Sequence, residues 1–332
     1  MKEFLDRVLL KDLVPLEKPI SIFIEPTNRC TFSCLHCPIS LQDYKERIGQ
    51  YTLSMEDFLH IALDIKKSFK KVKVINFYML GEPFLNSNLF KFVSKCKELD
   101  IAEYVRITTN GSLLSESVYQ SIFESGLDVL TISIYGLSDI EYKKTTQREF
   151  KFDKLVKNIE NFLSHRSKIT GGKKPFLQIS YFNTCEEKKK EVLEKFGKLV
   201  DHVHFQDVLN WTEEDNLFLN KVEHFKTPNK DVKVCPSPFY QLVVHSNLDV
   251  SICCNDWAKK LKVGSLRQNS LYDIWHSNEW NQIRLKMLKD GYKSVEGCKN
   301  CITPKYTVDS DNLDSLTFEE YIRRYKLYVS KK

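Results

Sequence analysis

The chain has 332 residues, 42% of them hydrophobic and 12% aromatic, which is enough for one large domain or for a large and a small one. Its 50 basic and 44 acidic residues are interspersed and give a net charge of +6, which argues against nucleic acid as a partner. No apolar stretch is long enough for a membrane span or a signal peptide, so we expect a cytoplasmic protein whose ten cysteines bind metal instead of forming disulfides.

Three cysteines near the N-terminus carry the strongest signal. Residues 1–18 alternate charged and apolar side chains and predict a helical extension, and a short apolar strand follows. Cys30, Cys34 and Cys37 come next, in a C-x3-C-x2-C loop. Four cysteines ligate a [4Fe–4S] cluster that only carries electrons, so three cysteines leave one iron open for chemistry.

Zinc is the alternative metal at this loop, with His36 as the fourth ligand. His36 is adjacent to Cys37, so both side chains would have to turn onto one ion from neighbouring positions. Iron and sulfide are therefore favoured, and the later motifs agree with this interpretation.

Apolar strand-like runs alternate with helical patterns from residue 20 to about residue 205. This alternation predicts βαβ units, a parallel sheet and covering helices, with too few units to close an eight-stranded barrel. We expect strands at 21–25, 72–78, 104–109, 129–134, 176–182 and 202–205, and helices at about 54–70, 86–99, 115–124, 153–166 and 186–198.

Short polar motifs end three of these strands. Any one of them alone would be an ordinary turn. The active site of an α/β barrel lies at the carboxyl ends of its strands, so we expect these motifs to meet the cysteine loop. Their candidate residues are Gly81, Glu82 and Pro83, then Thr109 and Asn110, then Ser133 and Tyr135.

The pattern changes after residue 208. Residues 209–234 lose the periodicity and predict a linker, and two β-rich runs around Ser246 and Asn247 then predict a hairpin. Helices are expected at about 270–288 and 317–329. Four further cysteines could form a tetrahedral zinc site: Cys235, Cys253, Cys298 and Cys301.

Together these motifs resemble the radical S-adenosylmethionine (SAM) superfamily, and the C-terminal part resembles its SPASM/twitch extension. The resemblance spans roughly residues 19–303. It implies an α/β fold with a partial (β/α)6 TIM barrel over residues 19–208 and, after the linker, a small α+β twitch domain over residues 235–332. It also implies SAM and two [4Fe–4S] clusters, one that binds SAM and one auxiliary.

In this family the open iron chelates SAM, whose reductive cleavage gives a 5′-deoxyadenosyl radical. The resemblance assigns SAM contacts to the strand-end motifs and places His36 near the adenine. A single glycine before Glu82 departs from the family's GGE motif, and Tyr135 departs from the common aspartate. The implied contacts are Gly81, Glu82 and Pro83 for the ammonium group, Thr109 and Asn110 for the ribose or carboxylate, and Ser133.

Full SPASM domains use additional cysteines and hold two auxiliary clusters, but no cysteine follows Cys301 here. The resemblance therefore implies one auxiliary cluster. Cys253 and Cys254 are adjacent, and strand alternation sends their side chains to opposite faces. Cys253 is taken as the cluster ligand, and Cys254 is the alternative. Cys96 is expected to be a core thiol.

Four hypotheses for the activity remain open. The first is oxidation of a sugar or cyclitol alcohol, as in twitch enzymes that oxidise an aminocyclitol, with Tyr135, Tyr181 or Arg148 as the base. The second is epimerisation, with Cys185 as hydrogen-atom donor; the alternative for Cys185 is a small buried hydrophobe.

The third hypothesis is maturation of a ribosomal peptide, which the short segment before the first strand makes less favoured. The fourth, an electron-transfer or zinc-scaffold protein, would require the strand-end motifs to be coincidences. The expected partners of an enzyme are a small-molecule substrate and a flavodoxin or ferredoxin that delivers electrons.

Overall fold

The computed structural model describes residues 8–172, 174–182, 185–206 and 230–330. The expected linker 209–234 lies outside these ranges except for its last five residues, 230–234. In the described part of the extension 1–18, one short helix forms, α1 (Leu10–Leu13).

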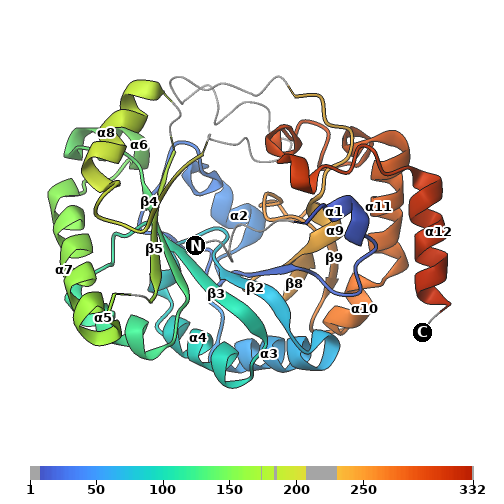
Figure 1. The fold of residues 1–332 in the computed structure, drawn as a ribbon, viewed down its shortest axis with the longest axis horizontal. Coiled ribbons are helices and arrows are strands. Elements are labelled where there is room, and N and C mark those ends of the chain that lie inside the picture. The colour runs from blue at the N-terminus through green and yellow to red at the C-terminus, as the bar shows by residue number, and fades with distance from the viewer. Residues whose placement is uncertain (1–7, 173, 183–184, 207–229, 331–332) are drawn as a thin grey trace.

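The strands of the described residues form one nine-stranded sheet in the order β6-β5-β4-β3-β2-β1-β7-β8-β9 (Figure 1). Strands β1 to β6 are parallel, which confirms the predicted parallel sheet. The bounds are β1 (Ser21–Ile24), β2 (Val72–Phe77), β3 (Ala102–Thr109), β4 (Val129–Ile134), β5 (Phe176–Tyr181), β6 (His202–Phe205), β7 (Gln241–Val244), β8 (Asp249–Ser251) and β9 (Lys262–Ser265).

Helices cover the outer side of the curved sheet, as Figure 1 shows for α3, α4, α5 and α7. Ser54, before α3, and Ser277, before α11, accept a hydrogen bond from a backbone N–H of the helix that follows, which defines where these helices begin. The remaining helices are α2 (Tyr44–Ile48), α3 (Met55–Phe69), α4 (Leu89–Glu98), α5 (Glu116–Glu124), α6 (Asp139–Thr146), α7 (Phe152–Thr170), α8 (Glu186–Phe196), α9 (Ser237–Tyr240), α10 (Leu271–Trp275), α11 (Asn278–Asp290) and α12 (Phe318–Val329).

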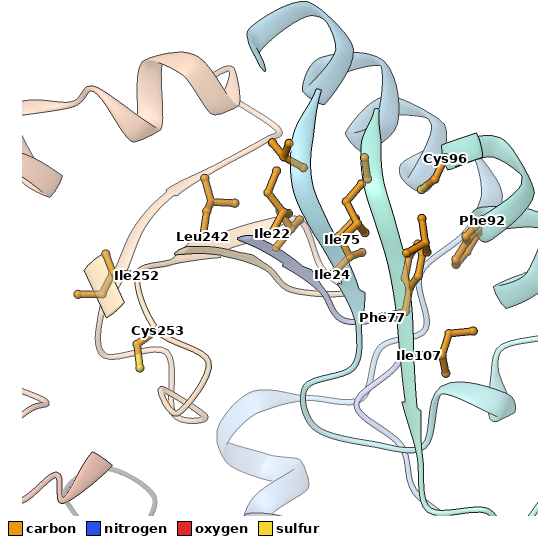
Figure 2. Close-up of a cluster of buried hydrophobic side chains, with 14 of the residues drawn as sticks. Ile22, Ile24, Ile75, Phe77, Phe92, Cys96, Ile107, Leu242, Ile252 and Cys253 are labelled. Carbon is orange, nitrogen blue, oxygen red and sulfur yellow. The ribbon is translucent and has the colours of Figure 1, made fainter. Parts of the chain in front are cut away.

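The core lies between the sheet and these helices. The ring of Phe77 on β2 packs against Phe58 of α3 and Phe92 of α4, with centroids 5.8 and 6.1 Å apart. Figure 2 shows Phe77, Phe92 and the fully buried Cys96 on this side of the strands, so Cys96 is a core thiol as predicted. Each large apolar side chain buried here stabilises the fold by about 1.5–3 kcal/mol.

The C-terminal hairpin joins the sheet of the N-terminal half. Strand β7 pairs in parallel with β1, and β8 and β9 continue the sheet in antiparallel fashion. The hairpin predicted around Ser246 and Asn247 is therefore confirmed, and it is an extension of the larger sheet. No helix in the part of the chain that the structure describes is long and apolar enough to cross a membrane.

Several helices differ from the prediction, and the short helices α2 and α9 were not predicted. The single helix expected at 270–288 is two helices, because Ser277 caps a new one after α10 ends at Trp275. Helix α6 was not predicted. It begins where the side chain of Ser138 accepts a hydrogen bond from Glu141 N, and it has almost no amphipathic pattern to reveal it.

Candidate active site

The cysteine loop begins at Cys30, six residues after β1 ends at the carboxyl edge of the sheet. Burial raises the pKa of the Cys30 thiol to about 11 and that of Cys37 to about 12, and it holds that of Cys34 well above its usual range. Negative charge on Cys30 raises the pKa values of the other two thiols further, so the three sulfurs are close enough to interact. Three clustered, buried thiols ionise only beside a cation, and this environment fits a metal cluster.

The turn after β2 packs directly on the start of this loop. Gly81 has φ +80°, and a Cβ there would lie 2.2 Å from the carbonyl oxygen of Thr27 and 2.7 Å from that of Arg29. The next residue, Glu82, donates its backbone N–H to Arg29 O at 2.8 Å. A glycine is therefore required at position 81, and the turn fixes the chain just before Cys30.

Glu82 connects the ends of β2 and β3. Its carboxylate accepts hydrogen bonds from Thr109 Oγ1 at 2.6 Å, from Asn110 N at 2.7 Å and from Phe84 N at 3.0 Å. Burial raises the pKa of this carboxyl to about 7, and these three bonds oppose the rise. The side chain, with no exposed surface, thus aligns the two strand-end motifs.

Asn110 extends this connection to the cysteine loop. Its Nδ2 lies 3.0 Å from Thr31 Oγ1 and 3.5 Å from Cys30 Sγ. Thr31 also bonds Ser112 through the two hydroxyl groups, 2.7 Å apart. The strand-end residues and the cysteine loop therefore form one hydrogen-bonded unit. This is the arrangement expected for motifs at the carboxyl ends of the strands of an α/β barrel.

An aromatic stack lies beside the loop. His36 stacks on Tyr135 and Phe182 with centroids 5.8 and 5.4 Å apart, and the planes of Tyr135 and Phe182 are nearly parallel, at 3°. Burial lowers the pKa of His36 to about 4, so this imidazole is neutral at pH 7. Tyr135 hydrogen-bonds Ser133 of β4. These rings offer a flat apolar surface for a planar base.

Phe182 was not predicted as a site residue. It directly follows β5, so the rule that directed attention to the carboxyl ends of the other strands also applies to it.

The second set of cysteines surrounds one pocket. Cys298 and Cys301 form a turn closed by a bond from Cys301 N to Cys298 O, and burial raises the pKa of Cys235 and Cys298. Cys254 is not among the lining residues; its Sγ accepts a hydrogen bond from Gln241 Nε2 at 3.8 Å. The pocket-lining cysteines are Cys235, Cys253, Cys298 and Cys301.

Within the described residues, no three His, Cys, Asp or Glu side chains converge on a point that would hold a single metal ion. The sulfurs around a [4Fe–4S] cluster each bind a different iron and stand further apart than the ligands of one ion. The buried, apolar lining of the four-cysteine pocket fits such a cluster.

The remaining candidate residues lie at the start of α8, just after α6 and on β5. Cys185 is half-buried at the start of α8, where its Sγ bonds Glu187 Oε2 at 2.7 Å. Arg148 is exposed just after α6. Tyr181 of β5 is buried, and the charges of Glu141 and Lys188 on neighbouring helices act on its pKa, which burial raises to about 12.

Two family models match the chain on either side of the linker. Residues 24–173 match the radical SAM superfamily, and residues 235–302 match SPASM, an iron–sulfur cluster-binding domain. The chain contains a radical SAM domain followed by a SPASM domain. The predicted family, fold class and enzyme class are thereby confirmed, as are SAM and iron–sulfur clusters as the cofactors of this radical SAM enzyme.

Two relatives illustrate the range of radical SAM proteins that the chain resembles. The S-adenosyl-L-methionine-dependent 2-deoxy-scyllo-inosamine dehydrogenase of Niallia circulans is 24% identical over 84% of this chain and 91% of its own length. The GTP 3′,8-cyclase of Staphylococcus epidermidis is 27% identical, but over only 45% of this chain and 44% of its own length. The similarity to the dehydrogenase therefore extends over most of both chains.

Solved structures share the fold. BtrN in complex with AdoMet and 2-DOIA covers 86% of this chain and 93% of its own, with a TM-score of 0.56 and 20% identity. SuiB of Streptococcus suis bound to S-adenosylmethionine covers 89% and 73%, with a TM-score of 0.63 and 17% identity. At these identities the likeness concerns the fold and not the substrate.

Proposed function

We propose that this radical SAM enzyme oxidises an alcohol carbon of a sugar or cyclitol to a carbonyl group. The observation that carries the proposal is the pocket lined by four cysteines, Cys235, Cys253, Cys298 and Cys301. Four thiolates occupy every iron of a cluster, so a cluster held there is suited to accept an electron and not to bind substrate. The similarity to a dehydrogenase over most of both chains supports the same reaction class.

When bound, SAM and the two clusters would supply a 5′-deoxyadenosyl radical that takes a hydrogen atom from the alcohol carbon and an acceptor for the remaining electron, and the hydroxyl proton would go to a base. Cys30, Cys34 and Cys37 would hold the SAM-binding cluster. His36 and Phe182 would pack against the adenine, and residues at the ends of β2, β3 and β4 would contact the rest of SAM: Gly81, Glu82, Pro83, Thr109, Asn110 and Ser133.

Tyr135 fits a positioning role better than that of the base. Burial holds its pKa well above its usual range, so the phenol stays protonated at neutral pH. A protonated phenol can donate a hydrogen bond to substrate but cannot take up a proton. The exposed position of Arg148 gives no support to it as the base either.

Anaerobic reconstitution tests the proposal. We expect about eight irons per chain, two cubane clusters, and formation of 5′-deoxyadenosine when SAM and dithionite are added. Aminocyclitols and sugars are then screened for a carbonyl product formed in a one-to-one ratio with 5′-deoxyadenosine. A Cys34→Ala variant should lose SAM cleavage and keep the second cluster.

Zinc in either site, or cleavage of SAM that never yields an oxidised product, would contradict the proposal. Flavodoxin and ferredoxin, the donors we propose, can replace dithionite in the same assay. The rate with each donor would then identify the partner.

A further inference from the structure

The strands β2 to β6 present a second face, opposite the side that packs on α3 and α4. The register of the sheet places side chains of neighbouring strands next to one another on this face: Asn76 pairs with Arg106, and Thr131 pairs with Gln178. Side chains two residues apart on a strand share a face, so the whole row can be assigned. Its polar members are Asn76, Arg106, Thr108, Thr131, Ser133, Gln178, Ser180, His202 and His204, and Val74, Tyr104, Val129 and Phe176 share the face nearer the amino-terminal ends of the strands.

Toward the carboxyl ends of the strands this face is polar, and its polar members include no carboxylate. In a half-buried parallel sheet, apolar side chains would be the ordinary choice for such positions. Several of these side chains are nonetheless withdrawn from solvent: Asn76, Thr131, Ser133 and Ser180 are each 4% exposed. A buried polar row is costly unless its groups are hydrogen-bonded, so their partners need to be identified.

Two neighbouring strands leave donors without partners on this face. The Nε of Arg106 on β3 and the Oγ1 of Thr131 on β4 are buried, and neither has a hydrogen-bond partner among the described residues. The ion pairs found in the described ranges do not include Arg106. Arg106 is half-buried, and a guanidinium group whose Nε is buried without a hydrogen-bond partner is stabilised by an anion that binds it.

A second basic element faces the same space. The positive charge of Arg106 lowers the pKa of His204 on β6, after burial and the charge of His202, so the guanidinium and this imidazole interact across the sheet. Burial and the charge of Cys254 raise the pKa of Tyr78, just after β2, and the positive charge of Arg106 opposes that rise. Arg106 is therefore within electrostatic reach of groups on both sides of it, His204 of β6 and Tyr78 after β2.

We infer that this face binds an anionic group of the substrate, a phosphate or a carboxylate, with Arg106 as its ion-pair partner and Thr131 as a hydrogen-bond donor. The inference rests on the proposed function and specifies its substrate class as an acidic sugar or cyclitol. Arginine suits this role because its planar fork bonds two oxygens of one anion. Thr131 lies two residues, about 7 Å, before Ser133 on the same strand. A small molecule held there would extend toward the strand-end residues that contact SAM.

Ligand binding to the reconstituted full chain tests this inference, with thermal shift and calorimetry as the readouts. The probes are myo-inositol 1-phosphate, glucuronate and inorganic phosphate, with uncharged myo-inositol as the reference. We expect an acidic probe to bind at least about ten-fold more tightly than myo-inositol. The phosphate and carboxylate probes compared with each other then show which anion the site prefers.

Variants localise the effect. Arg106→Gln should lose most of that discrimination, Arg106→Lys should retain part of it, and Thr131→Val should show a smaller loss. The control is Arg323→Gln, a change at an exposed arginine of α12. The comparison of probes on the unmodified protein needs no variant, so the test stands even if Arg106→Gln does not fold.

Equal binding of charged and uncharged probes would overturn the inference, as would an Arg106→Gln protein that binds acidic probes like the unmodified chain. A loss of SAM affinity in Arg106→Gln equal to the loss for acidic probes would assign Arg106 to the SAM site instead. Formation of 5′-deoxyadenosine without substrate is measured in parallel. If the unmodified chain forms no 5′-deoxyadenosine, the proposed function is wrong. The comparison of acidic and uncharged probes still tests the anion site in that case.

Discussion

The side-chain nitrogen of Asn110, at the end of β3, lies 3.5 Å from the sulfur of Cys30, 80 residues earlier in the chain. Asn110 is held in place because its backbone N–H donates to Glu82 Oε2 at 2.7 Å. A strand-end residue expected to contact SAM is thus also placed to donate a hydrogen bond to a cysteine that would bind the cluster.

We expect Asn110→Ala to make the potential of the SAM-binding cluster more negative. Hydrogen bonds to the sulfurs help set cluster potentials, because they stabilise the more negative reduced state. One such bond is worth about 1 kcal/mol, or about 40 mV for one electron. A redox titration followed by electron paramagnetic resonance measures the shift. Asn269→Ala, at an exposed position, is the control. An unchanged potential would show that the contact with Cys30 has no electronic effect.

Replacement of Gly81 by alanine should weaken SAM binding by at least about ten-fold. The new Cβ would collide with the carbonyl oxygen of Thr27 at 2.2 Å, so the turn would have to move away from the cysteine loop. Calorimetric titration with SAM measures the effect.

The matched control for this prediction is Gly126→Ala. Gly126 has a similar φ of +74°, but a Cβ there meets only Lys97 Cγ, at 3.5 Å. Both variants therefore include the cost of a left-handed alanine, about 1–2 kcal/mol. Only Gly81→Ala adds the collision. Equal SAM affinity in the two variants would mean that the close approach at Gly81 is unimportant for the site.

The two adjacent cysteines after β8 should respond differently to substitution. Cys253 lines the four-cysteine pocket and Cys254 does not, so Cys253→Ala should remove the auxiliary cluster, about four irons per chain. Cys254→Ala should leave the iron content unchanged. Iron and sulfide analysis of the two reconstituted variants shows which cysteine binds the auxiliary cluster. Loss of about four irons in Cys254→Ala and not in Cys253→Ala would make Cys254 the ligand.

His245 should make the unmodified chain more sensitive to mild acid than a His245→Asn variant. Its side chain is 1% exposed, its Nε2 lies 2.9 Å from Ser251 Oγ, and burial lowers its pKa from 6.5 to about 3. The unfolded chain therefore binds a proton below pH 6.5 that the folded chain does not, and stability falls as the pH falls.

Between pH 7.0 and 5.5 the free energy of unfolding of the unmodified chain should fall by about 1.3 kcal/mol more than that of the variant. Urea titrations at the two pH values measure this difference. The charged residues around the imidazole, Glu25, Asp249, Lys259 and Lys262, are the same in both proteins. A parallel loss in both would show that His245 does not titrate as its burial predicts.

Cys185→Ala should leave a dehydrogenase fully active. The Cys185 thiol bonds Glu187 and does not belong to the hydrogen-bonded unit around Cys30. An epimerase that uses this thiol as hydrogen-atom donor would lose turnover while still forming 5′-deoxyadenosine. The ratio of product to 5′-deoxyadenosine therefore distinguishes the two reactions.

Local signals made much of this protein predictable from its sequence. The cysteine spacing at residues 30–37 and the apolar runs that became β1 to β6 depend only on residues close together in the chain. Buried parallel strands are nearly continuous apolar runs, and their carboxyl ends meet at one edge, so the amino-acid sequence alone was enough to assign the strand-end motifs to one site.

Only the tertiary structure decided the relations between distant segments. It placed β7 beside β1, although more than 200 residues separate them, and it chose Cys253 over Cys254 as the lining of the pocket. It also left the Nε of Arg106 without a hydrogen-bond partner among the described residues. These features depend on strand register and on which side chains meet across the sheet. A single sequence records neither, because both follow from packing that many separate segments determine together.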